Sequence, residues 1–218
     1  MTTIERESTA AKRAAEHAPL FTEDADLDYL RLHVQALQRV LMRKGLVTYA
    51  EVLEEVHLLE ETDHRLGAKV VARAWTDPGF KQRLLQDGKA ACAELGIEIP
   101  GYDELQVVEN TDRVHHVAVC TTCSCVPSPL TGITPDWYKS AAYRARVVQE
   151  PRAVLREFGL ELPASVDVQV VDTSKARRCL VLPKRPPLSD GLPEEELAEL
   201  VTRDSLFGVG EATGPVGA

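Results

Sequence analysis

Hydrophobic residues recur at helical spacing near the beginning of the chain. From Asp28 to Lys44 they fall on one face, and Gly45 follows where a helix would end. The residues on this face are Leu30, Val34, Leu37 and Leu41. A second helical stretch, Tyr49 to Thr62, places Val52, Val56 and Leu59 among glutamates, which suits an arm that faces solvent or a partner. The pattern predicts a helical arm over residues 1–66, with residues 1–20 disordered.

The chain from Gly67 onward contains an internal repeat. Residues 94–100 (ELGIEIP) match residues 157–163 (EFGLELP) at an offset of 63, and the run QVV recurs at the same offset, at residues 106–108 and 169–171. This match predicts that residues 67–218 form one core built from two halves of the same design.

Each half begins with an acid followed by proline, a pair that favours the first turn of a helix. The pairs are Asp77-Pro78 and Glu150-Pro151, and a glycine in each repeated segment predicts where the helix ends. A β-rich run, a polar turn and a second β-rich run follow, the second runs being Val114–Val119 and Cys179–Leu182. Each half therefore reads as a helix plus a hairpin, and two halves predict an α+β core layered α-β-β-α. A final helix is expected from Pro193 to Phe207.

Composition excludes some partners. The 34 acidic residues exceed the 25 basic ones and give a formal charge of −9, so no excess of positive charge is present for nucleic acid or anionic lipid. The first residues lack the apolar stretch of a secretory signal, and no run approaches the ~20 apolar residues of a membrane span. We therefore expect a cytoplasmic protein that binds neither nucleic acid nor membrane.

Three cysteines lie within six positions, at Cys120, Cys123 and Cys125. In a loop after a strand, this spacing allows the sulfurs to face a common point, whereas a regular strand would send neighbouring odd and even positions to opposite faces. Thiolates are soft ligands and favour zinc, iron, cobalt or copper over magnesium or calcium. The segment therefore predicts a metal-binding loop, which we call the claw (residues 120–125).

Spacing alone leaves several kinds of site open. A structural zinc site would need a fourth ligand, and neither His115 nor His116 has zinc-finger spacing to the cysteines. An iron–sulfur cluster would usually need a fourth cysteine. Cys92 and Cys179 are remote in sequence and are expected to be small buried residues. A catalytic metal centre, a redox site and inert thiols are also compatible with the spacing.

The string from Val119 to Cys125, VCTTCSC, closely resembles the metal motif of nitrile hydratase α subunits and of the related thiocyanate hydrolase γ subunit. The resemblance covers roughly residues 28–210. It continues in GAKVVARAW (67–75), VVENT (107–111), PDWYKS (135–140) and LVTRDS (200–205). It favours a catalytic metal centre over structural zinc, an iron–sulfur cluster, a redox site or inert thiols.

The resemblance implies a low-spin trivalent metal held by the sulfurs of Cys120, Cys123 and Cys125 and by the backbone nitrogens of Ser124 and Cys125. It implies oxidation of Cys123 to sulfinic acid and of Cys125 to sulfenic acid, with arginines of a β-type partner subunit binding the oxidised sulfurs. Thr121 favours Co(III) over Fe(III) by the family trend. Catalysis is then expected at Cys125 and Cys123, where an oxygen on Cys125 can act as nucleophile or general base.

Further residues near the site follow from the same resemblance. Trp137 and Tyr138 are expected to shape the substrate pocket, although core aromatic residues would show the same pattern. Asp136 and Asp172 are candidates to support the ligands, or else ordinary turn or cap residues.

Two departures from the family pattern bear on substrate. Related cobalt-type subunits often carry bulky residues after the claw, and thiocyanate hydrolase γ subunits tend to carry arginine there, whereas this chain has Ser128. Gly101 stands where some relatives have a glutamine, so any role of that glutamine is in doubt. A small residue at 128 favours a bulky heteroaromatic nitrile, such as the nucleoside toyocamycin, over thiocyanate. The leading prediction is hydration of a nitrile to its amide. A thiocyanate hydrolase γ-type subunit and a zinc-stabilised binding protein are the competing hypotheses.

Overall fold

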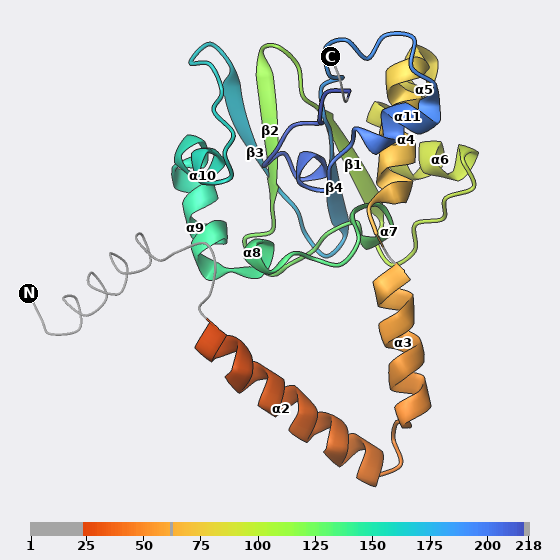
Figure 1. Cartoon of the computed structure of the whole chain (residues 1–218), viewed down its shortest axis with the longest axis vertical. Helices are drawn as coiled ribbons and strands as arrows, with labels where there is room; N and C mark the ends of the chain where they lie inside the picture. Colours follow the sequence, from red (N-terminus) through yellow and green to blue (C-terminus); the bar gives the residue numbers. More distant parts are fainter. Residues whose placement is uncertain (1–23, 62, 216–218) are drawn as a thin grey trace, which may run out of the picture.

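The computed structural model describes residues 24–61 and 63–215 (Figure 1). The helices are α2 (Asp24–Arg43), α3 (Tyr49–Glu61), α4 (Arg65–Thr76), α5 (Pro78–Gln86), α6 (Gly88–Glu94), α7 (Ser128–Thr131), α8 (Asp136–Lys139), α9 (Ala141–Gln149), α10 (Pro151–Glu157) and α11 (Glu194–Glu199). The strands are β1 (Glu104–Glu109), β2 (Val114–Val119), β3 (Asp167–Asp172) and β4 (Arg177–Leu182), and a 3₁₀ turn, η1, spans Asp204–Leu206. Residues 1–20, for which disorder is expected, lie outside the described residues. None of the described helices is long and apolar enough to cross a membrane.

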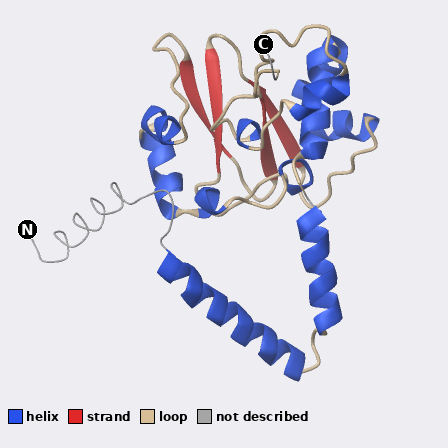
Figure 2. Ribbon diagram, in the orientation of Figure 1, coloured by secondary structure: helices blue, strands red, loops and turns tan. Residues whose placement is uncertain are grey.

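The core is layered, with two parallel strand pairs between two groups of helices (Figure 2). Helices α4, α5 and α6 pack on the β1–β4 pair through one apolar cluster. Helices α9 and α10 pack on the β2–β3 pair through a second cluster. Ala118, Cys179 and Val181 form a third cluster that joins the two strand pairs. The expected α+β architecture and its α-β-β-α layering are therefore confirmed.

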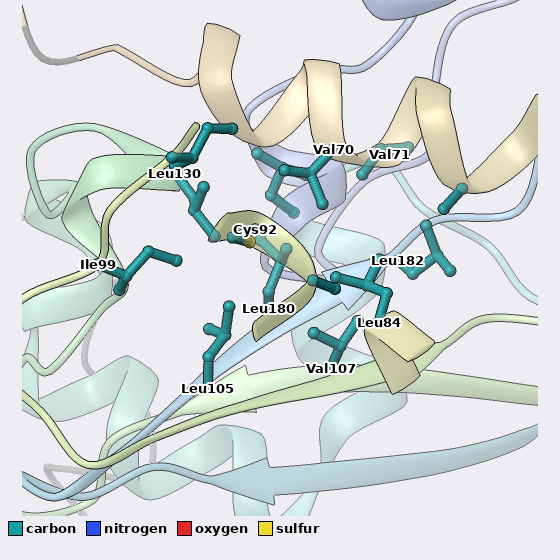
Figure 3. Packing of buried hydrophobic residues seen from close by; sticks show 14 of the residues in the cluster. Val70, Val71, Leu84, Cys92, Ile99, Leu105, Val107, Leu130, Leu180 and Leu182 are labelled. Carbon is teal, nitrogen blue, oxygen red and sulfur yellow. The ribbon is translucent and has the colours of Figure 1, made fainter. Parts of the chain in front are cut away.

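The first cluster shows why this arrangement is stable (Figure 3). Val70 and Val71 of α4 and Leu180 of β4 are fully buried, and Leu105 and Val107 of β1 point towards them. Full burial of one such side chain contributes roughly 1.5–3 kcal/mol. Cys92 lies in the same cluster at 0% exposure, so its expected role as a small buried residue is confirmed.

The predicted hairpins are wrong. β1 pairs with β4 and β2 pairs with β3, both in parallel, so each half exchanges a strand with the other. The polar turn after β1 does reverse the chain locally, since Thr111 N–H donates to Val114 O at 2.9 Å. The chain then crosses into the other strand pair. Both faces of β2 are covered, with Val117 and Val119 in one cluster and Ala118 in another, and such burial is typical of parallel pairing rather than of a surface hairpin.

The exchange preserves the internal repeat. β1 and β3 begin 63 residues apart (104 and 167), as do β2 and β4 (114 and 177). The two registers correspond as well, because Glu104 pairs with Arg177 and Val114 pairs with Asp167. The first strand of one half thus always pairs with the second strand of the other, in the same register. The two halves are therefore related by an approximate two-fold symmetry.

Two predicted helices are shorter than expected. Asp77 caps α5 by accepting from Phe80 N–H at 2.9 Å, as its sequence predicts, but the helix stops at Asp87, which caps α6 in turn. A side chain at Gly88 would meet Leu105 O of β1 at 2.5 Å, so the close packing of α6 on the strand requires glycine there. The expected helix from Pro193 to Phe207 is also broken, into α11 and η1. Thr202 Oγ1 accepts from Ser205 N–H and begins the second piece.

Helices α2 and α3 project from the layered core (Figure 1). The apolar face predicted for α2 is open to solvent, with Leu30 57%, Val34 63% and Leu37 60% exposed. Among the residues whose burial is described, the first buried one is Gly67 in α4. The chain therefore presents an apolar stripe that its own core does not cover.

Candidate metal centre

The claw lies at the end of β2, in the loop that leads to α7. Cys120 is fully buried, Cys125 is half-buried and Cys123 is exposed. Pro127 and Pro129 follow, and proline cannot continue the strand pairing, so the chain leaves the sheet here. The loop thus has one sulfur anchored in the core and two nearer the surface.

The three sulfurs lie together, within 4.8 Å of one another. The Sγ atoms of Cys120 and Cys123 are 3.1 Å apart, and those of Cys123 and Cys125 are 2.7 Å apart. All three cysteines are free, since a disulfide would need about 2.05 Å. Three soft sulfur donors gathered at one point are the ligands that a transition metal prefers, so the donor set fits such a metal. The predicted clustering of the three cysteines is confirmed.

Asp172 at the end of β3 holds the beginning of the claw. Because β2 and β3 are parallel, their carboxyl ends meet at one edge, which places Asp172 beside Thr121. One carboxylate oxygen accepts from Thr121 N–H at 3.0 Å, and the other accepts from the Thr121 hydroxyl at 2.7 Å. Asp172 therefore supports the loop between the first two cysteines.

Three hydroxyl groups hold the end of the claw. Thr173 Oγ1 donates to Cys125 O at 3.0 Å, and the Tyr138 hydroxyl reaches the same oxygen at 3.5 Å. Thr134 Oγ1 donates to Ser124 O at 3.3 Å. Thr173 and Thr134 were not among the residues singled out from the sequence. The only signal for Thr173 is its place directly after Asp172 at the end of a predicted strand.

The claw thiols differ in acidity. Burial raises the pKa of Cys120, but hydrogen bonds with Cys123, Thr122 and Thr173 outweigh this and hold the pKa below its usual value. The hydrogen bond with Cys120, followed by burial, raises the pKa of Cys123. Cys120 is therefore the first of this pair to become a thiolate, the form that binds metal.

The remaining cysteines and the histidines lie apart from the claw. Burial raises the pKa of both Cys92 and Cys179 to about 12, which keeps their thiols protonated and unreactive. His115 is buried, and its Nε2 lies 2.7 Å from Gly208 O. The backbone N–H of His116 donates to Asn110 at 2.7 Å. Neither histidine joins the sulfur cluster in the described part of the chain, so no fourth ligand of a structural zinc site is found there.

The residues predicted to line the substrate pocket occupy different environments. Ser128 is the exposed first residue of α7. Trp137 is only 9% exposed and makes edge-to-face contacts with several rings, those of Tyr138, Tyr143, Phe158 and Phe207. Tyr138 is buried beneath the claw, and burial raises its pKa.

Asp136 and Gly101 lie away from the ligands. Asp136 pairs with Lys139 of the same helix at 3.0 Å, so it is a surface ion pair rather than a support of the claw. Gly101 is exposed and has a backbone φ of 90°. A glutamine there would be strained, because side chains disfavour positive φ. The structure thus gives no basis for transferring the family glutamine's role to Gly101.

Three cysteine thiols clustered in a loop at the end of a parallel strand form a group that could hold a metal ion. Comparison with known proteins identifies the family. Residues 28–210 match the family model for the nitrile hydratase alpha chain. The cobalt-containing nitrile hydratase subunit alpha of Pseudonocardia thermophila is 51% identical over 178 residues, covering 81% of this chain and 87% of that protein. The chain belongs to the nitrile hydratase alpha-chain family, which confirms the resemblance seen in the sequence.

Two further relatives mark the breadth of the family. The thiocyanate hydrolase subunit gamma of Thiobacillus thioparus is 38% identical, covering 88% of this chain and 82% of that one. A solved structure of a mutant Fe-type nitrile hydratase from Comamonas testosteroni Ni1 is 41% identical with a TM-score of 0.80, covering 90% of this chain and 95% of that one. Relatives therefore include cobalt-containing and Fe-type enzymes and a hydrolase.

Proposed function

We propose that this chain is the metal-carrying subunit of a nitrile hydratase and that the claw is its catalytic centre. The observation that carries the proposal is the convergence of three sulfurs on one loop in a chain of this family. The sulfurs of Cys120, Cys123 and Cys125 and the backbone nitrogens of Ser124 and Cys125 would hold the metal. The hypothesis of a zinc-stabilised binding protein has no comparable support.

Cobalt is the proposed metal. Thr121 follows the first cysteine, and several relatives, including the one from Pseudonocardia thermophila, are described as cobalt-containing. When bound, Co(III) supplies a Lewis acid that polarises a nitrile or activates water. The Thr121 hydroxyl donates a hydrogen bond to Asp172, so the side chain of the residue that favours cobalt is held in place.

The burial of the claw assigns different tasks to its cysteines. Cys120 is enclosed by the core and serves as the inner anchor. Cys123 and Cys125 lie nearer the surface, so their sulfurs are accessible to oxidation. We propose that Cys123 carries a sulfinic acid and Cys125 a sulfenic acid, and that the oxygen on Cys125 acts on the nitrile carbon as nucleophile or general base.

A partner subunit is required by this proposal. The relatives are named as subunits, and the claw itself contains no arginine to bind oxidised sulfurs. The arm of α2 and α3 offers the apolar stripe described above, which a partner would cover. We propose that a β-type subunit docks on this arm and supplies the arginines that cap the claw.

A bulky heteroaromatic nitrile is the proposed substrate. Ser128 is exposed at the start of α7, directly beyond the claw, and its small side chain leaves space where a larger one would stand. Trp137 and Tyr138 are proposed to support the wall of the same pocket from within the aromatic cluster. Ser128 also lacks the positive charge that would favour thiocyanate.

Changing Ser128→Trp should select against large nitriles. The indole would obstruct a heteroaromatic ring more than a short aliphatic nitrile, and a change of ~1–3 kcal/mol, or roughly 10–200-fold in the ratio of kcat/KM values, is expected. Cobalt content should stay unchanged, because residue 128 contributes no proposed ligand. Ser165→Trp is the matched control. Ser165 is also exposed, and it lies just before the start of β3, at the end of the strand away from the claw. Equal losses on small and large nitriles with full cobalt would show that residue 128 is not a size filter.

The test of the function uses the chain co-produced with its β-type partner in cobalt-containing medium. The purified complex should convert a nitrile to the amide without forming acid. Conversion of thiocyanate and not of nitriles would favour the second candidate, a thiocyanate hydrolase, which the 38% identical relative represents. Absence of both activities in a cobalt-loaded complex would contradict the proposal.

A further inference from the structure

Thr173 contacts the chain on both sides of the claw. Its side chain is only 4% exposed, and its hydroxyl donates to Cys125 O at 3.0 Å. Its backbone N–H donates to Val119 O at 2.7 Å. The residue therefore bonds the last residue of β2, just before the claw, and the last residue of the claw itself, and its side chain also interacts with the Cys120 thiol.

Comparison with the other half of the internal repeat shows which of these two hydrogen bonds is specific to the claw. Asn110 occupies the equivalent position in the other half, at the repeat offset of 63, and its N–H donates to Leu182 O at 2.9 Å in the same way. Its side-chain oxygen, however, accepts from the N–H of His116 at 2.7 Å, within its own half. The backbone bond is thus a feature of the shared architecture. The bond from the Thr173 hydroxyl to Cys125 occurs at the claw and has no counterpart at Asn110 among the described contacts.

We propose that Thr173 is a positioning residue whose hydroxyl sets the orientation of Cys125. The carbonyl, nitrogen and side chain of Cys125 branch from one Cα, so a fixed carbonyl restricts where the Cys125 sulfur and nitrogen point. Thr173 is the principal donor, because the Tyr138 hydroxyl lies further from the same oxygen, at 3.5 Å. The inference rests on the proposed function, in which that sulfur and nitrogen are ligands.

A second buried threonine, Thr131, provides a control. It distinguishes the general effect of losing a buried hydroxyl from the loss of a bond that positions Cys125. Thr131 is also fully buried, and its hydroxyl donates to a carbonyl, that of Pro127, at 3.3 Å. Valine has the shape of threonine without the hydroxyl, so each change removes one buried hydroxyl and its hydrogen bond. Only Thr173→Val removes a bond to the claw.

The experiment compares Thr173→Val, Thr173→Ser and Thr131→Val, each in the cobalt-loaded complex with the β-type partner. We expect Thr173→Val to assemble, to shift the sulfur-to-cobalt charge-transfer absorption, and to lower kcat by roughly 10–100-fold with KM changed less, as for other groups that orient metal ligands. Thr173→Ser should restore both the absorption and kcat, and Thr131→Val should alter neither. If Thr173→Val does not assemble, the smaller Thr173→Ala takes its place.

A Thr173→Val complex with the absorption and kcat of the unaltered protein would overturn the inference and leave the proposed function intact. Failure of Thr173→Ser to restore them, or equal effects of Thr131→Val, would also overturn it. An unaltered complex that binds no metal and hydrates no nitrile would instead refute the proposed function itself.

Discussion

Replacing any one of Cys120, Cys123 or Cys125 by alanine should abolish both cobalt binding and nitrile hydration. Each change removes one of three sulfurs that lie within 4.8 Å of one another, and no other group of this kind replaces it among the described residues. Loss of a group that only supports a ligand costs about 10–100-fold in metal affinity or activity, so loss of a ligand should exceed this. Elemental analysis of the purified complex and amide formation under saturating nitrile measure the two effects.

The chain supplies its own controls for this experiment. Cys92→Ala and Cys179→Ala remove thiols that are buried and remain protonated, with pKa values raised to about 12 by burial. These variants should keep cobalt and activity and lose stability by roughly 1 kcal/mol, the usual scale of a single substitution. If either variant lost its metal while a claw variant kept it, the assignment of the claw would be wrong.

Placing charges on the apolar stripe of α2 should prevent assembly with the partner subunit. Val34 and Leu37 are 63% and 60% exposed in the chain alone, so changing both to glutamate should not disturb its core. If the partner covers them, the loss of two buried side chains costs roughly 3–6 kcal/mol. This corresponds to about 10²- to 10⁴-fold weaker association. Co-purification and sedimentation of the mixed subunits provide the measurement.

The matched variant changes Gln35 and Ala36, which are exposed and lie opposite the apolar stripe, to glutamate. It adds the same charge to the same helix on another face, so it should assemble nearly as well as the unaltered chain. Equal loss of assembly in both variants would indicate a general effect of charge on the arm. Undisturbed assembly of the Val34→Glu and Leu37→Glu variant would show that the partner docks elsewhere.

The claw was predictable because its signal is local. Three cysteines at spacings of three and two residues must lie close together in any loop of this length, and Pro127 and Pro129 prevent regular structure from continuing. The family resemblance then favoured a catalytic cobalt centre over structural zinc. The helix starting at Pro78 and the burial of Cys92 were likewise predictable, from a capping aspartate in one case and from residue type in the other.

Strand pairing was not predictable, because it depends on distant partners. The run from Glu104 to Val119 has the composition and turn of a hairpin, yet its two strands pair with β4 and β3. What decides the pairing is the burial of both faces of strands such as β2, which becomes apparent only when the helix layers and the second half are present. The repeat offset of 63 was visible in the sequence, but it is equally compatible with two hairpins and with exchanged strands.

The residues that support the claw also differ in whether the sequence could have identified them. Asp172 could be suspected as a residue at the end of a strand, and its bonds to Thr121 follow from the parallel pairing of β2 and β3. Thr173 could not be singled out, because a threonine in a polar turn is ordinary and its hydroxyl bond to Cys125 spans 48 residues. The break at Gly88 was also hidden, since it depends on the close approach of Leu105 from β1.

The most direct test of the central claim is a joint determination of the metal and of the mass of the peptide containing Cys120–Cys125, both from one preparation of the complex. We expect about one cobalt per chain and about three additional oxygen atoms on this peptide, two on Cys123 and one on Cys125. Finding zinc alone, with all three thiols unmodified, would contradict it.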